Sequence, residues 1–138
     1  MKKVRIILIV ILVLILAGGA AVYYVFNKPH RDVEGEKALQ VAANDLFKNY
    51  TQNEKQSNSN YLDKALEVEG RIEEVRTNQD NKTVVVFKTD DPIYGVVCTF
   101  KTSLANLGNG SDITVKGLCS GYDGNDVKLR DCVLVHPK

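Results

Sequence analysis

The chain has 138 residues, of which 25% are charged, and a formal net charge of +1. This length leaves room for about one globular domain. The near-neutral charge gives no general electrostatic reason to expect a polyanionic partner, which argues against a strongly basic nucleic-acid-binding protein.

The first feature along the chain is an apolar stretch, residues 6–26, that contains no charged side chain. As a helix with a rise of about 1.5 Å per residue, it would be roughly 31 Å long, enough to cross the hydrocarbon core of a bilayer. The preceding residues 1–5 contain three basic side chains, and this excess predicts a cytoplasmic tail with the rest of the chain across the membrane. A cleaved signal peptide is the alternative. Because the apolar run continues to Phe26, which is long for a signal peptide, we expect an uncleaved transmembrane anchor.

Residues 27–60 are predicted to form a helical stalk or linker. Apolar residues recur there at helical spacing, which predicts an amphipathic helix over about 34–50. Residues 51–60 contain no apolar side chain and are typical of a solvated helix end or a linker. We expect the helix to be a packing element or stalk rather than a helix that binds a partner.

From residue 61 onward the apolar period changes to two, which predicts strands with one buried face. The expected strands cover residues 66–73, 83–88, 94–100, 113–119 and 127–135. The pair Glu74-Val75 breaks the alternation, as a β-bulge would. A short helix is expected over 103–112, between the third and fourth strands. Five short strands, this helix and a glycine in the first strand predict a small closed barrel over 61–138.

Four segments of this region resemble the OB-fold family called tRNA_anti-like: YLDKALEVEGRIEEV, YGVVCTF, ITVKGLCSGY and DVKLRDCVLV. Members of that family are small bacterial proteins, often anchored to the membrane directly or by a lipid. The resemblance covers about residues 40–138. It implies a mainly β fold, a five-stranded OB-fold barrel preceded by an amphipathic helix and an N-terminal transmembrane helix. It implies nucleic-acid binding only by analogy.

Charge disfavours nucleic acid as the ligand of the barrel. Residues 61–138 hold ten Lys/Arg and twelve Asp/Glu, a net charge of −2, so counterion release would contribute little to binding. Few aromatic side chains remain for base stacking, since Phe87 and Phe100 lie within apolar strands. A local basic stripe is still conceivable because four cations occupy the polar side of their strands: Arg71, Lys116, Lys128 and Arg130. Nucleic-acid binding is therefore kept as the alternative function.

Catalytic and cofactor-binding patterns are absent from the sequence. The sequence contains no nucleophile motif such as Gly-x-Ser-x-Gly. Of the two histidines, His30 lies beside the apolar stretch and His136 lies in the C-terminal tail, and neither is placed to serve as the base of a catalytic dyad. The adjacent acids of Glu73-Glu74 would point to opposite faces of a strand, which does not suit paired-carboxylate catalysis. We expect no enzyme, no cofactor and no metal.

The three cysteines do not have the spacing of a zinc site, because no close pair occurs among them. The loop at 121–126 lacks the later carboxylate of a calcium loop and is typical of a hairpin turn. An oxidising compartment would favour a disulfide between Cys132 and either Cys119 or Cys98. Three buried thiols are the other interpretation, and the sequence does not choose between them.

The sequence thus predicts a single-pass membrane-anchored, non-catalytic OB-fold module that is exposed outside the cytoplasm. A protein of the cell envelope is the expected partner. The expected binding face comprises the second and third strands of the barrel, with the loops at 77–82 and 121–126. The candidate contacts are Arg71, Tyr94, Tyr122 and Arg130.

Overall fold

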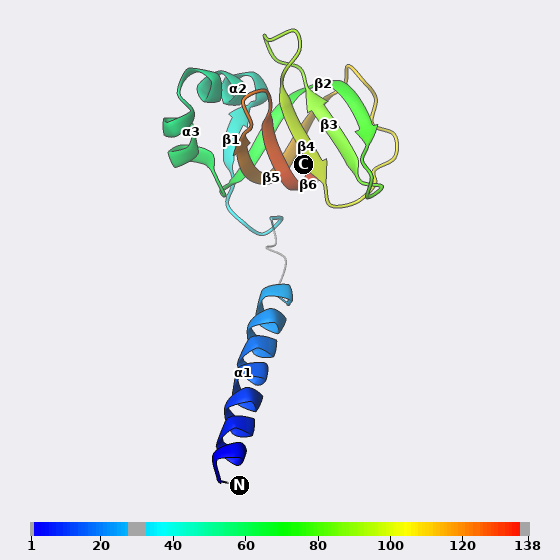
Figure 1. Cartoon of the computed structure of the whole chain (residues 1–138). Coiled ribbons are helices and arrows are strands. Elements are labelled where there is room, and N and C mark those ends of the chain that lie inside the picture. The colour runs from blue at the N-terminus through cyan, green and yellow to red at the C-terminus, as the bar shows by residue number, and fades with distance from the viewer. Residues whose placement is uncertain (1, 28–32, 136–138) are drawn as a thin grey trace. The chain divides into compact units, whose positions relative to one another are not determined.

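The computed structural model describes residues 2–27 and 33–135, and the chain divides into two compact units, Met1–Arg31 and Asp32–Lys138. The first unit contains helix α1 (Lys2–Phe26), which buries none of its side chains and reaches a mean hydropathy of 3.0 (Figure 1). A helix that is apolar all round is stable in lipid rather than in water. The expected helix, long and apolar enough to span a membrane, is therefore confirmed.

The second unit is built mainly from strands (Figure 1). Its elements in chain order are β1 (Leu39–Ala42), α2 (Ala43–Gln52), α3 (Glu54–Tyr61), β2 (Ala65–Thr77), β3 (Thr83–Phe87), β4 (Val96–Phe100), β5 (Asp112–Tyr122) and β6 (Val127–Val135). The strand order is β2–β3–β4–β6–β5, and β5 also pairs with β2, so that five strands close a barrel. These pairs are antiparallel except β4 with β6, and β1 adds a sixth strand parallel to the first half of β2. The expected five-stranded barrel is confirmed.

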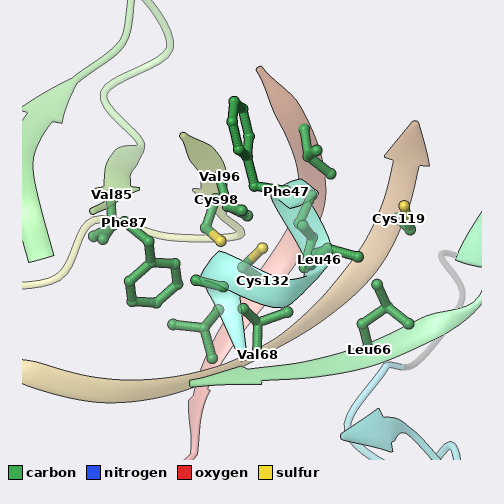
Figure 2. Packing of buried hydrophobic residues seen from close by; sticks show 14 of the residues in the cluster. Leu46, Phe47, Leu66, Val68, Val85, Phe87, Val96, Cys98, Cys119 and Cys132 are labelled. Atoms are coloured by element: carbon green, nitrogen blue, oxygen red, sulfur yellow. The ribbon is translucent and has the colours of Figure 1, made fainter. Parts of the chain in front are cut away.

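The core lies inside the barrel (Figure 2). Side chains at alternate strand positions point inward, as Cys98 and Phe100 do from β4, and are buried. Helix α2 adds four buried residues: Ala43, Leu46, Phe47 and Tyr50. Each large apolar side chain that is fully buried contributes roughly 1.5–3 kcal/mol relative to exposure, so α2 is an integral packing element of this unit.

A glycine in β2 allows α2 to pack this closely. A Cβ atom at Gly70 would lie 2.9 Å from the Cβ of Ala43, the first residue of α2, and 3.0 Å from the ring of Phe87. Both distances are shorter than ordinary carbon–carbon contacts, which are about 3.5–4.0 Å. The glycine that the sequence places in the first barrel strand therefore marks the contact between strand and helix.

The helix expected over 34–50 is wrong at its start. Residues 39–42 form β1 instead, with Leu39 opposite Leu66 and Ala42 opposite Glu69, and the helix begins at Ala43. The edge of β2 is unpaired there, because β3 pairs only with β2 from Ile72 onward. Hydrogen bonds to the unpaired backbone groups of β2 therefore outweigh the preference for a helix that the spacing of the apolar side chains indicates.

The segment expected to end or link this helix forms a second helix, α3. Asn53 caps it, since its side-chain oxygen accepts a hydrogen bond from the backbone N–H of Gln56 at 3.1 Å. Apart from Ser57, its side chains are exposed or only partly buried. The segment is solvated as expected, and it is a separate helix rather than the end of the preceding one.

The helix expected over 103–112 is also wrong, because no helix forms there. The backbone of Leu104 hydrogen-bonds to the hydroxyl of Thr83, and the N–H of Gly110 donates to the carbonyl of Ile72 at 2.7 Å. Asn106 has φ +67°, a left-handed conformation that interrupts a helix. The polar backbone groups are thus satisfied by the barrel rather than by a local helix.

Within residues 33–135 the strand register shifts at three places, of which one lies on β5 between Cys119 and Gly121 and the other two bear on the sites described below. One of these two lies between Ile72 and Glu74 of β2, beside the predicted break at Glu74-Val75. The other lies at Asp131 of β6, which has φ +52° and interrupts the register with both neighbouring strands. The second bulge changes the face to which the following residues point, which decides the position of Cys132.

Candidate functional site

The outer face of β3, β4 and β6 carries an open hollow of about 370 Å³. Val84, Val97 and Thr99 line it from β3 and β4. These positions alternate with the inward-facing residues of the same strands, so their side chains point away from the core. The remaining lining residues are Arg76, Asn78, Ser120, Lys128, Leu129 and Arg130. We call these nine residues the outer-face hollow.

Among residues 2–27 and 33–135, three cations line the outer-face hollow, and no carboxylate or aromatic side chain does. Carboxylates outside the lining pair with each of these cations. Lys128 is 2.6 Å from Asp123, whereas Arg76 is 3.9 Å from its neighbour on β2, Glu74. The hollow is therefore cationic and its surroundings are acidic, which limits its attraction for a polyanion.

Arg130 is the one predicted contact that lines the outer-face hollow. Its guanidinium lies 3.3 Å from the carboxylate of Asp63 and 3.6 Å from that of Asp131. All three side chains are substantially exposed, so solvent screens these ion pairs and they contribute little to stability. Arg130 is therefore available to exchange a carboxylate for a ligand.

Arg71 lies on a different surface. It borders a larger hollow of about 1140 Å³ beside β1 and β2, together with Lys88 and the carboxylates of Glu67, Glu69 and Asp112. The charges of this second hollow are mixed, and its lining is shared among five elements and the residue after β3. The structure does not bring Arg71 together with Arg130.

Tyr94 and Tyr122 belong to the end of the barrel where β4 and β6 begin. The loops before these strands are joined there, because the N–H of Gly95 donates to the carboxylate of Asp126 at 2.9 Å. The hydroxyl of Tyr122 donates to the carbonyl of Gly124 at 2.8 Å. The four predicted contacts are thus divided among three places.

The same end of the barrel is acidic. Burial raises the pKa of Tyr122, and the nearby carboxylates of Asp123 and Asp91 raise it further. The pKa of Asp91 is lowered because its carboxylate accepts hydrogen bonds from the backbone N–H groups of Ile93 and Tyr94. This end of the barrel is consequently poorly suited to phosphate.

The loop at 123–126 forms the expected hairpin turn. The carboxylate of Asp123 accepts from the N–H groups of Asn125 at 3.0 Å and Asp126 at 2.8 Å. Lys128 and these N–H groups lower the pKa of Asp123. Gly124 has φ +94°, a conformation that an L side chain rarely adopts. Turn geometry therefore accounts for the acidic residues of the loop.

The basic stripe considered from the sequence is only partly assembled. Lys128 and Arg130 meet in the outer-face hollow, but the ammonium of Lys116 donates to the backbone carbonyls of Glu34 and Glu36. Sequence reasoning missed Arg76 and did not single out Asn78 within the loop 77–82 that it assigned to the binding face. Both lie beyond the bulge in β2, and counting parity through the bulge would have placed Arg76 on the outer side.

The cysteines are free thiols in this structure, and all three are buried. Burial raises the pKa of Cys119 and that of Cys132 above the usual value for a thiol. No group of three or more His, Cys, Asp or Glu side chains suited to a metal ion occurs within 2–27 and 33–135. His30 and His136 lie outside the described residues.

A closed barrel with this strand order and one parallel pair, β4 with β6, defines the OB-fold class of binding domains. The family model named tRNA_anti-like matches residues 1–133, and the chain belongs to that family.

A crystal structure from Klebsiella pneumoniae subsp. pneumoniae, described as a "putative nucleic acid-binding lipoprotein", has a TM-score of 0.54 to this chain. The match covers 79% of this chain and 100% of that chain, at 18% sequence identity. At this identity the likeness shows a shared fold alone. No curated protein matches the chain.

Proposed function

We propose that the protein is a single-pass, membrane-anchored OB-fold binding module that acts outside the cytoplasm and is not catalytic. Helix α1 would hold it in the membrane, and the outer-face hollow would receive its ligand. A protein of the cell envelope is the partner that we favour. The observation that carries the proposal is the hollow itself, because it combines an apolar floor on β3 and β4, the strands that OB-folds use for binding, with cations from the flanking strands β2 and β6.

The chemistry of the described side chains supports a binding role over catalysis. A cysteine nucleophile needs an accessible thiolate. Burial instead raises the pKa of Cys119 and of Cys132, which keeps both thiols protonated at neutral pH. The fold family is one of binding domains, and fold alone assigns no reaction.

The apolar floor of the outer-face hollow favours a protein ligand. Val84 and Val97 are buried or nearly so by their neighbours, and the polar groups of Thr99 and Asn78 lie beside them. An apolar centre with a polar rim is the usual composition of a protein interface. The three cations would then select a partner that presents carboxylates.

Single-stranded nucleic acid is the second candidate. The cations of the outer-face hollow favour it, and the solved structure of similar fold carries a nucleic-acid-binding description. Two observations count against it: within the part of the chain that the structure describes, no aromatic side chain lines the hollow, and carboxylates flank all three cations. Three phosphate contacts would give a salt slope of only about −2 for a single strand.

Photo-crosslinking in living cells tests the proposal. A photoreactive p-benzoylphenylalanine replaces Thr99 in the hollow, and in a matched control it replaces Lys55, which is exposed on α3. We expect an adduct from position 99 and none from position 55. The adduct should resist nuclease and be digested by protease, because the favoured partner is a protein.

A charge variant sharpens this test. Exchanging the three cations of the hollow for Gln should reduce the adduct at least fivefold, about 1 kcal/mol of binding free energy. The matched control exchanges three exposed cations outside the hollow and changes the net charge equally: Lys37, Lys55 and Lys88. Equal adducts from positions 99 and 55, or none, would contradict the proposed site. A nuclease-sensitive adduct would establish the second candidate instead.

A further inference from the structure

Two of the three cysteines face each other inside the barrel. Cys98 lies on β4 and Cys132 on β6, the adjacent parallel strand. Figure 2 shows their sulfur atoms close together in the core. Burial raises the pKa of Cys132, and the two thiols are near enough for Cys98 to raise it further; both side chains are almost completely buried.

The bulge at Asp131 creates this arrangement. Cys98 is opposite Leu129 and Phe100 is opposite Cys132, so β6 contains one residue more than β4 between the two pairs. If β6 were a regular strand without this bulge, position 132 would share the outward parity of Lys128 and Arg130. The bulge turns its side chain into the core.

A glycine on the other neighbouring strand makes room for the thiol. A Cβ atom at Gly117 of β5 would lie 2.5 Å from the sulfur of Cys132. Real Cβ atoms essentially never come this close, so any larger residue at 117 would displace the sulfur. The bulge and the glycine are independent features, and together they place Cys132 next to Cys98.

Cys119 has a different environment. Its sulfur is 3.3 Å from the hydroxyl of Tyr50, which belongs to α2. In Figure 2 it lies apart from the two facing sulfurs. Of the two partners that the sequence left open for Cys132, Cys98 lies beside it and Cys119 does not.

We propose that Cys98 and Cys132 are oxidised to an intramolecular disulfide that fastens β6 to β4 and leaves Cys119 as a thiol. Both S–H bonds break, one S–S bond forms, and two protons are released. The two electrons reduce the disulfide of an exported thiol–disulfide oxidoreductase to two thiols. The inference rests on the proposed function in one respect, since export to an oxidising compartment supplies this oxidant.

The order of events follows from burial. The folded barrel excludes a bulky oxidant from both sulfurs, so the bond must form while β6, the last strand in the chain, is still joining β4. Once formed, the same burial protects the bond from reductants. The disulfide closes a loop from residue 98 to residue 132 that contains β5. It also opposes the separation of β4 from β6, two strands that are far apart in the sequence.

Tryptic mapping tests the pairing directly, because each cysteine falls in its own peptide: 89–101, 117–128 and 131–138. The full chain is isolated from membranes with a thiol-blocking reagent and digested without reductant. We expect peptide 89–101 linked to 131–138, and peptide 117–128 carrying the blocking group. The intact mass should be lower by two hydrogen atoms than that of the reduced chain.

A second experiment tests the cysteine pairing without requiring that the protein be exported to an oxidising compartment. The purified full chain is unfolded and refolded in a glutathione redox buffer, which tests the geometry in any compartment. The same linked peptide is expected, with Cys119→Ala as a matched variant that retains it and Cys132→Ala as one that loses it. Reduction should lower Tm by roughly 10 °C or more.

Each unfavourable result has a distinct meaning. A link between peptides 117–128 and 131–138, or three blocked thiols after refolding, overturns the assigned pairing. A link after refolding together with three blocked thiols in the membrane sample overturns the disulfide in the cell. Neither result decides the ligand-binding proposal, which depends on the photo-crosslinking experiment.

Discussion

At the scale of single residues, Tyr50 joins the helices to the barrel. Its ring is buried and packs at 6.1 Å from the rings of Tyr61 and Tyr122, and its hydroxyl contacts the sulfur of Cys119. Burial, followed by the hydrogen bond with Cys119, raises the pKa of Tyr50 well above its ordinary value. The neutral phenol is therefore the form that the folded state requires.

This environment predicts a loss of stability at alkaline pH. Because the pKa of Tyr50 is higher in the folded state than the value of about 10 in the unfolded chain, its contribution is complete below pH 10 and falls as pH rises above it. The raised pKa of Cys119 starts the decline earlier, above about pH 8.5. The free energy of unfolding, measured with urea, should therefore decrease from pH 8.5 to pH 11.

The variant Tyr50→Phe isolates the contribution of the phenol. At pH 7 we expect a loss of about 1 kcal/mol from the missing hydrogen bond, and above pH 10 a shallower decline than in the parent chain. Tyr94→Phe, in a partly exposed loop, is the matched control and should change stability by less than about 0.5 kcal/mol. An unchanged alkaline slope in Tyr50→Phe would show that the phenol is not the titrating group.

At the scale of elements, the segment before β1 is fastened to the barrel. Val33 is completely buried against Ala65 and Leu118. The ammonium of Lys116 donates to the carbonyl of Glu34 at 2.9 Å and also to that of Glu36. Lys116, which was considered for a basic binding stripe, thus fixes the segment 33–36 to the barrel.

The substitution Lys116→Met should weaken the attachment of the segment 33–36 to the barrel. It retains the length of the side chain but removes both charge-assisted hydrogen bonds, so we expect tryptic cleavage after Lys37 to become at least fivefold faster, about 1 kcal/mol of local stability. Lys55→Met, exposed on α3, is the control. Unchanged cleavage would mean that the burial of Val33 alone fastens the segment.

The elements show what local patterns predict and what they do not. Alternating apolar residues in β2, β5 and β6, and short apolar runs in β3 and β4, located all five barrel strands. The short strand β1 and the missing helix over 103–112 depend on unpaired backbone of β2 and on Thr83. Such partners are remote in sequence, so no local pattern reports them.

At the scale of the whole molecule, the proposal concerns the side of the membrane on which the second unit acts. The basic residues before the apolar helix predict a cytoplasmic N-terminus. A bacterial alkaline phosphatase fused after residue 138 is active only outside the cytoplasm, and we expect it to be active. Intact mass spectrometry of the chain should show the uncleaved 15.3 kDa protein in the membrane fraction.

A charge variant tests the reason for this orientation. Exchanging Lys2, Lys3 and Arg5 for Gln removes the charge asymmetry and should reduce the phosphatase activity per chain. The control exchanges three lysines of the second unit, remote from α1 in sequence: Lys55, Lys64 and Lys82. An inactive fusion to the unaltered chain would contradict the proposed topology, and a shorter mass would identify a signal peptide.

The sequence by itself determined the apolar helix and the strands of the barrel, because a long run of apolar side chains is unfavourable in water and apolar residues at every second position are buried by a strand. The tertiary structure decided which cations share a surface and which cysteines face each other. Both depend on bulges, at Ile72–Glu74 and at Asp131, that change the direction of every later side chain in the strand. A bulge is stabilised by the register of neighbouring strands, and that register is set by contacts between residues far apart in the chain.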